Sequence, residues 1–596
     1  MTHSNISARK DFAVDPITLE VVRNGLLSAV IEMTDNLVRT AYSPIAAEVK
    51  DFSLCLLDAA GDVIMQTPHA APGFVADLKV TIETGLEIFG ADGFEQGDVV
   101  MSNEAKIAGQ HLNNVAIYSP IIVDGKVVAF AAVRSHWIDV GGAISGSMSS
   151  NSRDIFAEGI QFPTMKVYRA GKPDPEIHRL IEYNSRFPEL VLGDMRAQIS
   201  ACRLGERRFL ELTTKYGADV VQACIGRIDD EAETLARAAI TNIPDGIYEA
   251  SCRLDTDGIN LDRPIPLHVK LIVEGSELTI DFSGMPPQVE GPCNSRAAET
   301  IARLAHKFIT SPETPVTSGA FRNLKVICPE GTIISADWRA PMGWWAMPIN
   351  TTIDMVLRAL HPAMPDRVTA GHTDNIGAGA VSGVDPRTGQ RYQTLVPYTG
   401  AWGATSRNDG ISAVVSLAQG DVRITPVELR ENMFPIRIEE FSLRADSGGP
   451  GRYRGGLGVK TVTKVLARCN YDARYERTID PPWGLAGGLP GKIARTYRTR
   501  ADSEDVIDLP FTAHQLVFEA GDREYALTGG GGGFGNPLER DVSAVRNDVV
   551  KGYVSLELAR EAYGVAINPE TFEVDETATA ALRSRIGSPT MTSAVA

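Results

Sequence analysis

The sequence has few cysteines, and they show no paired spacing. Seven occur in 596 residues, and none stands at the short spacing that a disulfide framework or a zinc ribbon requires. They are Cys55, Cys202, Cys224, Cys252, Cys293, Cys328 and Cys469. An odd, dispersed set in a long chain is typical of reduced thiols, so we expect a cytoplasmic protein.

Long apolar runs are also missing. Nowhere do about 18 apolar residues follow one another, which a membrane-spanning helix would need. The first residues, MTHSNISARKDFAVDP, lack the apolar run of a signal peptide. We therefore expect a soluble intracellular protein that does not cross a membrane.

Positive charge is scarce. Lys and Arg number 58 against 75 Asp and Glu, which gives a formal net charge of −17 at pH 7. Non-specific binding to nucleic acid or to an anionic membrane needs a basic face, so the charge argues against both partners. A phosphate-binding loop is missing as well, because neither GGLGVKT at 455–461 nor LTGGGGGFGNP at 527–537 has the spacing GxxxxGK followed by Ser or Thr. The glycines at 529–533 predict a close backbone approach or a tight coil instead.

The composition is that of an ordinary globular protein, with 43% apolar and 22% charged residues. Helical periodicity runs along residues 16–37 and through most of 175–240, while residues 246–282 alternate as short strands with turns. These patterns predict an α+β, multi-domain fold with a mixed helical N-terminal part and a β-rich central and C-terminal part. The predicted domains are residues 1–244 with the candidate site, residues 245–480, and residues 481–596 with a flexible tail.

Two histidines flank a predicted hairpin. Val115 to Val123 and Lys126 to Val133 form its strands, and Asp124-Gly125 is a strong two-residue turn. The hairpin would place His111, before the first strand, next to His136, after the second.

A residue with a side-chain oxygen follows each histidine at the same spacing in the sequence. Asn114 and Asp139 stand three residues beyond His111 and His136. Imidazole and oxygen donors suit zinc, manganese or iron, and an open coordination position would make such an ion catalytic. A single histidine near a strand end is nevertheless more often a hydrogen-bonded structural residue, and no HExxH or CxxC pattern strengthens the signal.

Two further residues have a functional and a structural interpretation. His69, in TPHAAPG after a second predicted hairpin, could face the same cleft as His111, although a plain loop histidine is the commoner case. Cys293 precedes a predicted helix, and a helix N-terminus lowers the pKa of a thiol. Because no histidine base lies near it in sequence, the structural interpretation of Cys293 is favoured.

Ten segments of the chain, in order, carry a family resemblance. They are DPITLEVVRNGL at 15, RTAYSP at 39, KDFSLCLLDAAGDVIMQTPH at 50, GQHLNNV at 109, RSHWIDVGG at 134, LGDMRAQISACRLGERR at 192, GPCNSRAA at 291, LRADSGGPGRYRGGLG at 443, PPWGLAGGLPG at 481 and TGGGGGFGNPLERD at 528. Together they cover about residues 15–565. The chain resembles the hydantoinase B/5-oxoprolinase B family (N-methylhydantoinase B-like), whose relatives include subunits of acetone and acetophenone carboxylases and of caprolactamase.

The resemblance implies one half of a two-component enzyme. A larger A-type partner binds ATP and phosphorylates an unreactive oxygen, and the B-type chain completes the reaction. Metal-containing relatives use an HxxD motif and a downstream histidine, which match His111, Asn114 and His136 here. A metal-bound water would be the nucleophile, with His69 or Asp139 orienting it or accepting its proton.

The sequence departs from the family pattern at three places. The usual HLND or HLPD ends here in Asn114, and a neutral amide is a poorer donor to a hard cation than a carboxylate. The usual NDPY is Asn103-Glu-Ala-Lys106, and the family's second histidine after Gln-x-Pro-His is replaced near Gly73. The metal site would then be weaker, rely on Asp139, or be lost, and the substrate would differ from the usual one.

The leading hypothesis is the B-type subunit of an ATP-dependent amidohydrolase. It would open a hydantoin, 5-oxoproline or lactam-like ring, with a divalent metal in this chain, ATP on the A-type partner, and a hetero-oligomer as the working form. The alternative is a subunit of an ATP-dependent ketone carboxylase of the acetone or acetophenone type. A third hypothesis is a non-catalytic scaffold for the ATPase, if Asn114 has abolished the metal site.

Overall fold

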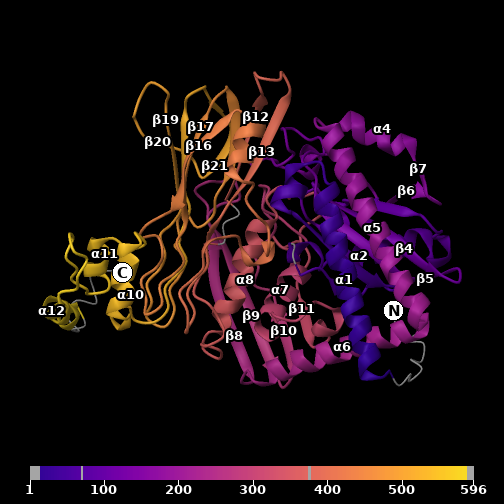
Figure 1. The fold of residues 1–596 in the computed structure, drawn as a ribbon, viewed down its shortest axis with the longest axis horizontal. Coiled ribbons are helices and arrows are strands. Elements are labelled where there is room, and N and C mark those ends of the chain that lie inside the picture. Colours follow the sequence, from indigo (N-terminus) through magenta and orange to yellow (C-terminus); the bar gives the residue numbers. More distant parts are fainter. Residues whose placement is uncertain (1–13, 69–70, 374–376, 587–596) are drawn as a thin grey trace.

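The computed structural model describes residues 14–68, 71–373 and 377–586. Helices and strands are mixed along the chain, as the α+β prediction requires (Figure 1). The N-terminal part lies at one end of the molecule, a β-rich part lies in the middle, and the last helices lie at the opposite end (Figure 1).

The N-terminal part is built on a seven-stranded antiparallel sheet in the order β2-β1-β5-β4-β3-β6-β7. Its strands are β1 (Phe52–Asp58), β2 (Val63–Gln66), β3 (Val99–Ser102), β4 (Asn114–Val123), β5 (Lys126–His136), β6 (Met165–Arg169) and β7 (Lys172–Pro173). Asp124 and Gly125 have φ of 51° and 74°, the left-handed conformation of a type I′ turn. Both predicted hairpins, β1-β2 and β4-β5, are therefore confirmed.

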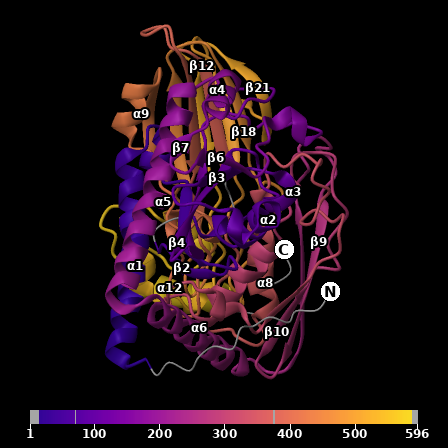
Figure 2. The ribbon, with the colours of Figure 1, turned by 90° about the vertical axis from the view of Figure 1, so that its right-hand side faces the viewer.

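Helices cover both faces of this sheet. Alternate residues face opposite sides: Leu54 and Leu56 join the main core, while Cys55 and Leu57 join a second core under α2. α1 and α5 pack side by side on the main-core face (Figure 2). The helices of this part are α1 (Pro16–Thr40), α2 (Leu78–Phe89), α3 (Ala105–Ala108), α4 (Pro175–Asn184), α5 (Pro188–Tyr216) and α6 (Ala218–Thr241), with short turns η1 (Ile45–Val49), η2 (Pro72–Phe74), η3 (Ala91–Gly93) and η4 (Ile155–Glu158).

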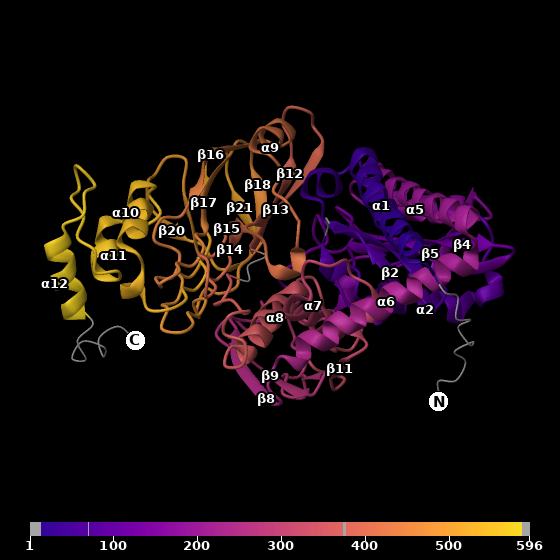
Figure 3. The ribbon, with the colours of Figure 1, turned by 60° about the horizontal axis from the view of Figure 1, so that its bottom comes forward.

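A four-stranded sheet follows, in the order β11-β10-β9-β8. α6 runs from the first sheet toward it, and α8 packs on β8 and β9 (Figure 3). The elements are β8 (Gly246–Leu254), β9 (Ile265–Glu274), β10 (Glu277–Asp281), α7 (Ala298–Thr310), η5 (Ser318–Phe321), β11 (Leu324–Ile327) and α8 (Ala346–Leu360). One hydrophobic core, with residues from Leu19 to Val422, packs against both sheets. The predicted boundary at 244/245 therefore lies between the two sheets, which share this core.

The following β-rich part contains a four-stranded, a two-stranded and a five-stranded sheet. The elements are β12 (Gly377–Val384), β13 (Arg391–Tyr398), β14 (Gly400–Ala401), β15 (Ser412–Val414), η6 (Leu417–Gln419), α9 (Val427–Met433), β16 (Ile436–Leu443), β17 (Val459–Val465), β18 (Cys469–Arg474), β19 (Arg495–Thr499), β20 (Ile507–Asp508), β21 (Thr512–Phe518) and β22 (Arg523–Leu527). β18 pairs with β21, and β17 pairs with β22. The predicted boundary at residue 480 falls between the paired strands of both sheets.

The glycine run that follows β22 packs against other backbone segments. A Cβ atom at Gly530 would lie 1.9 Å from Ser447 O, and one at Gly531 would lie 2.0 Å from Trp402 O. No side chain fits at such distances, so the prediction of a close backbone approach is confirmed.

The C-terminal helices form a small separate core. They are α10 (Val542–Val550), α11 (Leu556–Glu561) and α12 (Glu576–Ile586), preceded by η7 (Pro537–Glu539). The predicted flexible tail, residues 587–596, lies outside the described residues. Within the described ranges, no helix is long and apolar enough to cross a membrane.

Candidate functional site

The ends of the β4-β5 hairpin bring the two predicted histidines together. Asn114 pairs with His136 at the last position of the register, and His111 stands just before β4. The ring centroids of His111 and His136 are 4.7 Å apart, with the rings nearly perpendicular. Both side chains are buried, with exposed fractions of 6% and 2%. The predicted convergence of the two imidazoles is therefore present.

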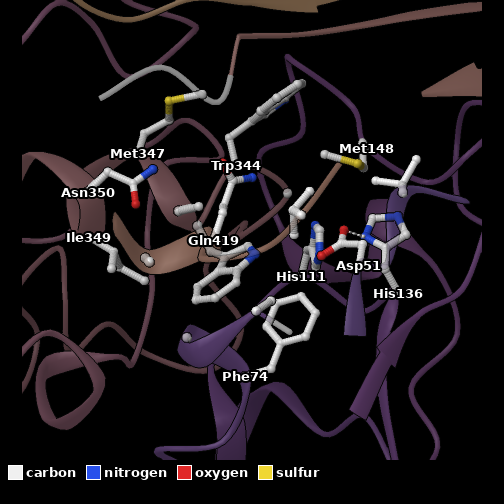
Figure 4. Close-up of a pocket in the computed structure, with 18 residues that line it drawn as sticks. Asp51, Phe74, His111, His136, Met148, Trp344, Met347, Ile349, Asn350 and Gln419 are labelled. Carbon is white, nitrogen blue, oxygen red and sulfur yellow. Dashed lines mark ion pairs between the residues drawn. The ribbon is translucent and has the colours of Figure 1, made fainter. Parts of the chain in front are cut away.

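A carboxylate that was not singled out in the sequence faces the same pair. Asp51 stands just before β1, which pairs with β5, and the His136 N–H donates to Asp51 O at 3.0 Å. Asp51 Oδ2 lies 3.4 Å from His136 Nδ1 (Figure 4). Burial raises the pKa of Asp51 to about 7. The carboxyl can therefore exchange a proton near neutral pH.

A chain of buried hydrogen bonds orients His111. Arg134 donates to Asp77, and Gln110 Nε2 donates to the other oxygen of Asp77 at 2.8 Å. Gln110 Oε1 is then left to accept from Asn114 Nδ2 at 2.7 Å, which leaves Asn114 Oδ1 to face His111 Nε2 at 2.8 Å.

This chain fixes the tautomer of His111. A guanidinium is always a donor, and the Asp77 carboxylate that pairs with it accepts through both oxygens, which sets the orientation of Gln110 and then of Asn114. His111 therefore carries its proton on Nε2 and keeps a lone pair on Nδ1. Asn114 contacts His111 and is not among the residues that line the cavity described below.

Both imidazoles are neutral at pH 7. Burial lowers the pKa of His111 to about 4. Burial also lowers the pKa of His136 well below its usual range, and the neighbouring His111 lowers it further. In the described part of the chain, neither Nδ1 atom meets the geometry of a hydrogen bond, and the nearest charged group to His136 Nδ1 is Asp51 Oδ2 at 3.4 Å. Buried ring nitrogens that make no regular hydrogen bond are candidate contacts for a ligand.

The two histidines and Asp51 form the polar end of a cavity of about 70 Å³. Its walls come from distant segments: η2, the chain around 343–347 with the start of α8, and η6 (Figure 4). Phe74, Trp344 and Trp345 are the large aromatic side chains of the lining, and the Trp345 ring centroid lies 5.9 Å from that of His111. The cavity therefore offers a mainly apolar space beside a few polar atoms.

Glu158 ties two cavity segments together. Its carboxylate accepts hydrogen bonds from Met342 N and Gly343 N at 3.0 and 2.9 Å, and from Ser152 Oγ at 2.6 Å. The Gly/Ser-rich loop 141–153 thereby packs against the tryptophan segment, and its Met148 lines the cavity. Burial raises the pKa of Glu158 to about 7.

Asp139 does not reach the cavity, contrary to its predicted role. Its carboxylate accepts from the Arg186 side chain at 2.9 Å, from Arg186 N at 2.7 Å and from Gly146 N at 3.0 Å. With its oxygens used in this way, Asp139 supports the loop after β5, and Asp51 is the carboxylate beside His136. His69 lies outside the described residues.

Cys293 is a buried thiol that packs with Trp344 and Met347. Burial raises the pKa of this thiol to about 12, so it carries no thiolate at neutral pH. The structural interpretation of Cys293 is confirmed.

The donor types at this site fit a divalent metal. His111, His136 and Asp51 offer two imidazole nitrogens and a carboxylate, which suit zinc, manganese or iron. Among the residues that the structure describes, no group of three or more His, Cys, Asp or Glu side chains is arranged to hold an ion. The donors are therefore neighbours without forming a finished coordination sphere.

Comparison with known proteins gives end-to-end matches. The family model described as Hydantoinase B/oxoprolinase matches residues 15–537. The B component of a putative D-/L-hydantoinase of Pseudomonas sp. (strain NS671) is 31% identical over 591 residues, which cover 96% of this chain and 98% of that protein. The beta chain of the caprolactamase of Pseudomonas jessenii is 32% identical over 587 residues, which cover 96% and 99%.

Solved structures share the fold. The ATP-dependent caprolactamase from Pseudomonas jessenii matches with a TM-score of 0.89 at 30% identity, covering 96% of this chain and 100% of that chain. An acetone carboxylase, in its nucleotide-free structure, matches with a TM-score of 0.86 at 20% identity, covering 96% and 83%. At 20% identity, the second similarity shows the fold alone.

Proposed function

This chain belongs to the hydantoinase B/oxoprolinase family, and from that premise we propose that it is the B-type subunit of a two-component, ATP-dependent amidohydrolase. The proposed reaction opens a hydantoin, 5-oxoproline or lactam-like ring at its C–N bond. The relatives from a hydantoinase and from a caprolactamase support it, because each matches this chain over nearly its full length.

The observation that carries the proposal is the buried group of His111, His136 and Asp51 at the end of an apolar cavity. An uncharged ring fits between aromatic walls, and its carbonyl would meet the polar end. His111 Nδ1 is a neutral acceptor that can hold a water molecule against that carbonyl, and Asp51 lies beside His136 Nδ1. Asp51 can take up the proton that the water loses, because the pKa of its carboxyl is about 7.

The same three residues would hold the proposed divalent ion. Zinc, manganese or iron, when bound, would polarise the carbonyl and lower the pKa of a water molecule. Asn114 would hold His111 in the tautomer whose Nδ1 is free, and need not itself contact the ion.

ATP would be used on a partner chain. The sequence contains no phosphate-binding loop, so an A-type subunit must supply the nucleotide site, and the working enzyme would be a hetero-oligomer. In this division of labour the partner activates the amide, and this chain completes the hydrolysis.

The experiment is a reconstitution of this chain with its A-type partner. The complex is incubated with ATP and a panel of hydantoins, 5-oxoproline and lactams, with and without labelled bicarbonate. We expect ATP-dependent ring opening that needs no bicarbonate. Incorporation of label into a ketone would replace the proposal by the carboxylase reaction. Activity that survives His111→Ala in a metal-free chain would leave this chain the role of a scaffold.

A further inference from the structure

A second cavity, of about 620 Å³, lies outside the candidate site. It is enclosed by α7, by the chain from Pro312 to Val316, and by the end of β2. Its volume is within the range of small-molecule pockets. Nothing in the ring-opening proposal uses it.

This cavity and the candidate site share a wall one residue thick. In η2, Pro72 lines the second cavity, while Gly73 and Phe74 line the first. In η6 and the residue after it, Leu417 and Gly420 line the second, while Ala418 and Gln419 line the first. The two turns touch, because a Cβ atom at Gly73 would meet Ala418 O at 3.0 Å. The second cavity therefore adjoins the candidate site directly.

A buried lysine lines the second cavity. Lys307 on α7 is 8% exposed, and its ammonium donates to Ser311 Oγ at 2.9 Å and to Thr314 Oγ1 at 2.6 Å. Its third contact is Pro315 O at 3.4 Å. In the described part of the chain, no carboxylate lies within ion-pair distance of this ammonium, and burial lowers its pKa to about 8.

A second cation stands one helical turn earlier on the same face. Arg303 lines the cavity, donates to Ala76 O at 3.4 Å and packs over the Phe321 ring at 5.5 Å. Its Nε lies 3.4 Å from Glu299, whose side chain is exposed. The acidic residues of the lining are Glu313, which is exposed, and Asp421, which pairs with Arg423. The buried part of the cavity is therefore basic.

We propose that the second cavity binds a small oxyanion, a carboxylate or a phosphate, with the Lys307 ammonium as its charge partner and Arg303 as a further donor. A cation buried without a counter-charge costs free energy, and an anion in the cavity removes that cost. The Ser311 hydroxyl accepts from Lys307 and can rotate to donate to the same anion, while the Thr314 hydroxyl donates to Ser311 O at 3.1 Å. The site does not depend on the ring-opening reaction.

The test uses the full chain without partner or ATP. Binding of inorganic phosphate is followed by 31P line broadening, and binding of acetate by proton saturation transfer. We expect at least one of them to bind, with affinity reduced at least about 10-fold by Lys307→Met and reduced less by Arg303→Gln. Lys325→Met, on an exposed position of β11, is the matched control and should bind as the wild type does.

The outcomes separate the ligand sources. Binding of phosphate alone assigns the cavity to phosphate, binding of acetate alone assigns it to carboxylates, and binding of both assigns it to oxyanions in general. Thermal unfolding without ligand shows whether each variant is folded, and Lys307→Arg, which keeps the charge, should retain binding if Lys307→Met does not fold. Absence of binding to both probes, or affinity unchanged in Lys307→Met and in Arg303→Gln, would overturn the proposal.

Discussion

Asn114 shows how one side chain can serve a site without entering it. Its amide is the fourth member of the series of hydrogen bonds that leads from Arg134 to His111. Its oxygen accepts the His111 Nε2 proton at 2.8 Å. The family resemblance predicts an acid at this position, and an acid would accept the same proton with a charge-assisted bond. The amide therefore keeps His111 in the same orientation, but the imidazole is less basic than it would be beside a carboxylate.

Replacing Asn114 by aspartate should strengthen metal binding. The carboxylate would pull on the His111 Nε2 proton and make Nδ1 a better donor to an ion, for a gain on the order of 10-fold in affinity. The measurement is a zinc or manganese titration of the purified chain. Asn114→Leu is the companion variant and should weaken binding, because it leaves His111 without its partner. Equal affinities in all three proteins would show that position 114 has no influence on an ion.

Gln110→Leu should weaken the site from a greater distance. The substitution breaks the chain between Asp77 and Asn114, so the Asn114 amide is free to turn and the tautomer of His111 is no longer fixed. We expect ring-opening activity of the reconstituted complex to fall roughly 10-fold or more. Gln222→Leu, at a half-buried glutamine that donates to Val128 O, is the control and should leave activity unchanged. Wild-type activity in Gln110→Leu would show that the hydrogen bonds from Asp77 through Gln110 to Asn114 are not needed to orient His111.

The sequence could predict His111 and His136 because a local signal connects them. The Asp124-Gly125 turn sets the register of one hairpin, and that register places both histidines at its open end. Asp51 could not be found in this way, because it reaches His136 through the pairing of β1 with β5, which no local pattern encodes. The matching spacing of Asp139 was misleading, since Arg186 draws that carboxylate away.

Among the elements, strands and helices were more predictable than cavity walls. The long helices α1 and α5 and the two hairpins follow from periodicity and turn chemistry. The cavity is closed by η2, η6 and the chain around Trp344, which are short and far apart in sequence. Turns of this kind take their shape from the surfaces that they pack on, so their meeting point is not readable from the sequence.

Glu158, at the end of η4, should make stability depend on pH. Its pKa rises from 4.5 in the unfolded chain to about 7 in the fold, so between these values the folded protein holds a proton that the unfolded chain has lost. Its contribution to stability therefore falls as pH rises from about 5 to about 7 and is level above that. Glu158→Gln lacks this contribution, so the free energy of unfolding of the variant minus that of the wild type should rise over this window, by about 3 kcal/mol at most.

Chemical denaturation of both proteins at several pH values provides the measurement. Glu182→Gln, at an exposed position of α4, is a suitable control, because Glu182 is not among the groups that shift the pKa of Glu158. A difference between wild type and Glu158→Gln that stays constant from pH 5 to 8 would contradict the assigned pKa.

At the scale of the whole molecule, the fold class could be predicted from the sequence, and the positions of domain boundaries could not. The α+β, multi-domain prediction is confirmed, and the family resemblance agrees with matches that extend over nearly the whole chain. The predicted boundary at 480 falls between paired strands, because Lys460 of β17 pairs with Leu527 of β22 and Arg474 of β18 pairs with Thr512 of β21. Pairings between distant segments leave no compositional mark, so composition alone could not place that boundary.

The central claim is that two imidazoles in one cavity complete a reaction that a partner chain begins. Ring opening by the reconstituted complex, measured in His136→Ala beside ATP binding by the partner, tests this claim most directly. His178→Ala, at a half-buried histidine on α4, is the control and should behave as the wild type does. The account predicts that His136→Ala lowers ring opening by roughly 1,000-fold or more while ATP binding is unchanged. Ring opening at the wild-type rate in His136→Ala would contradict it.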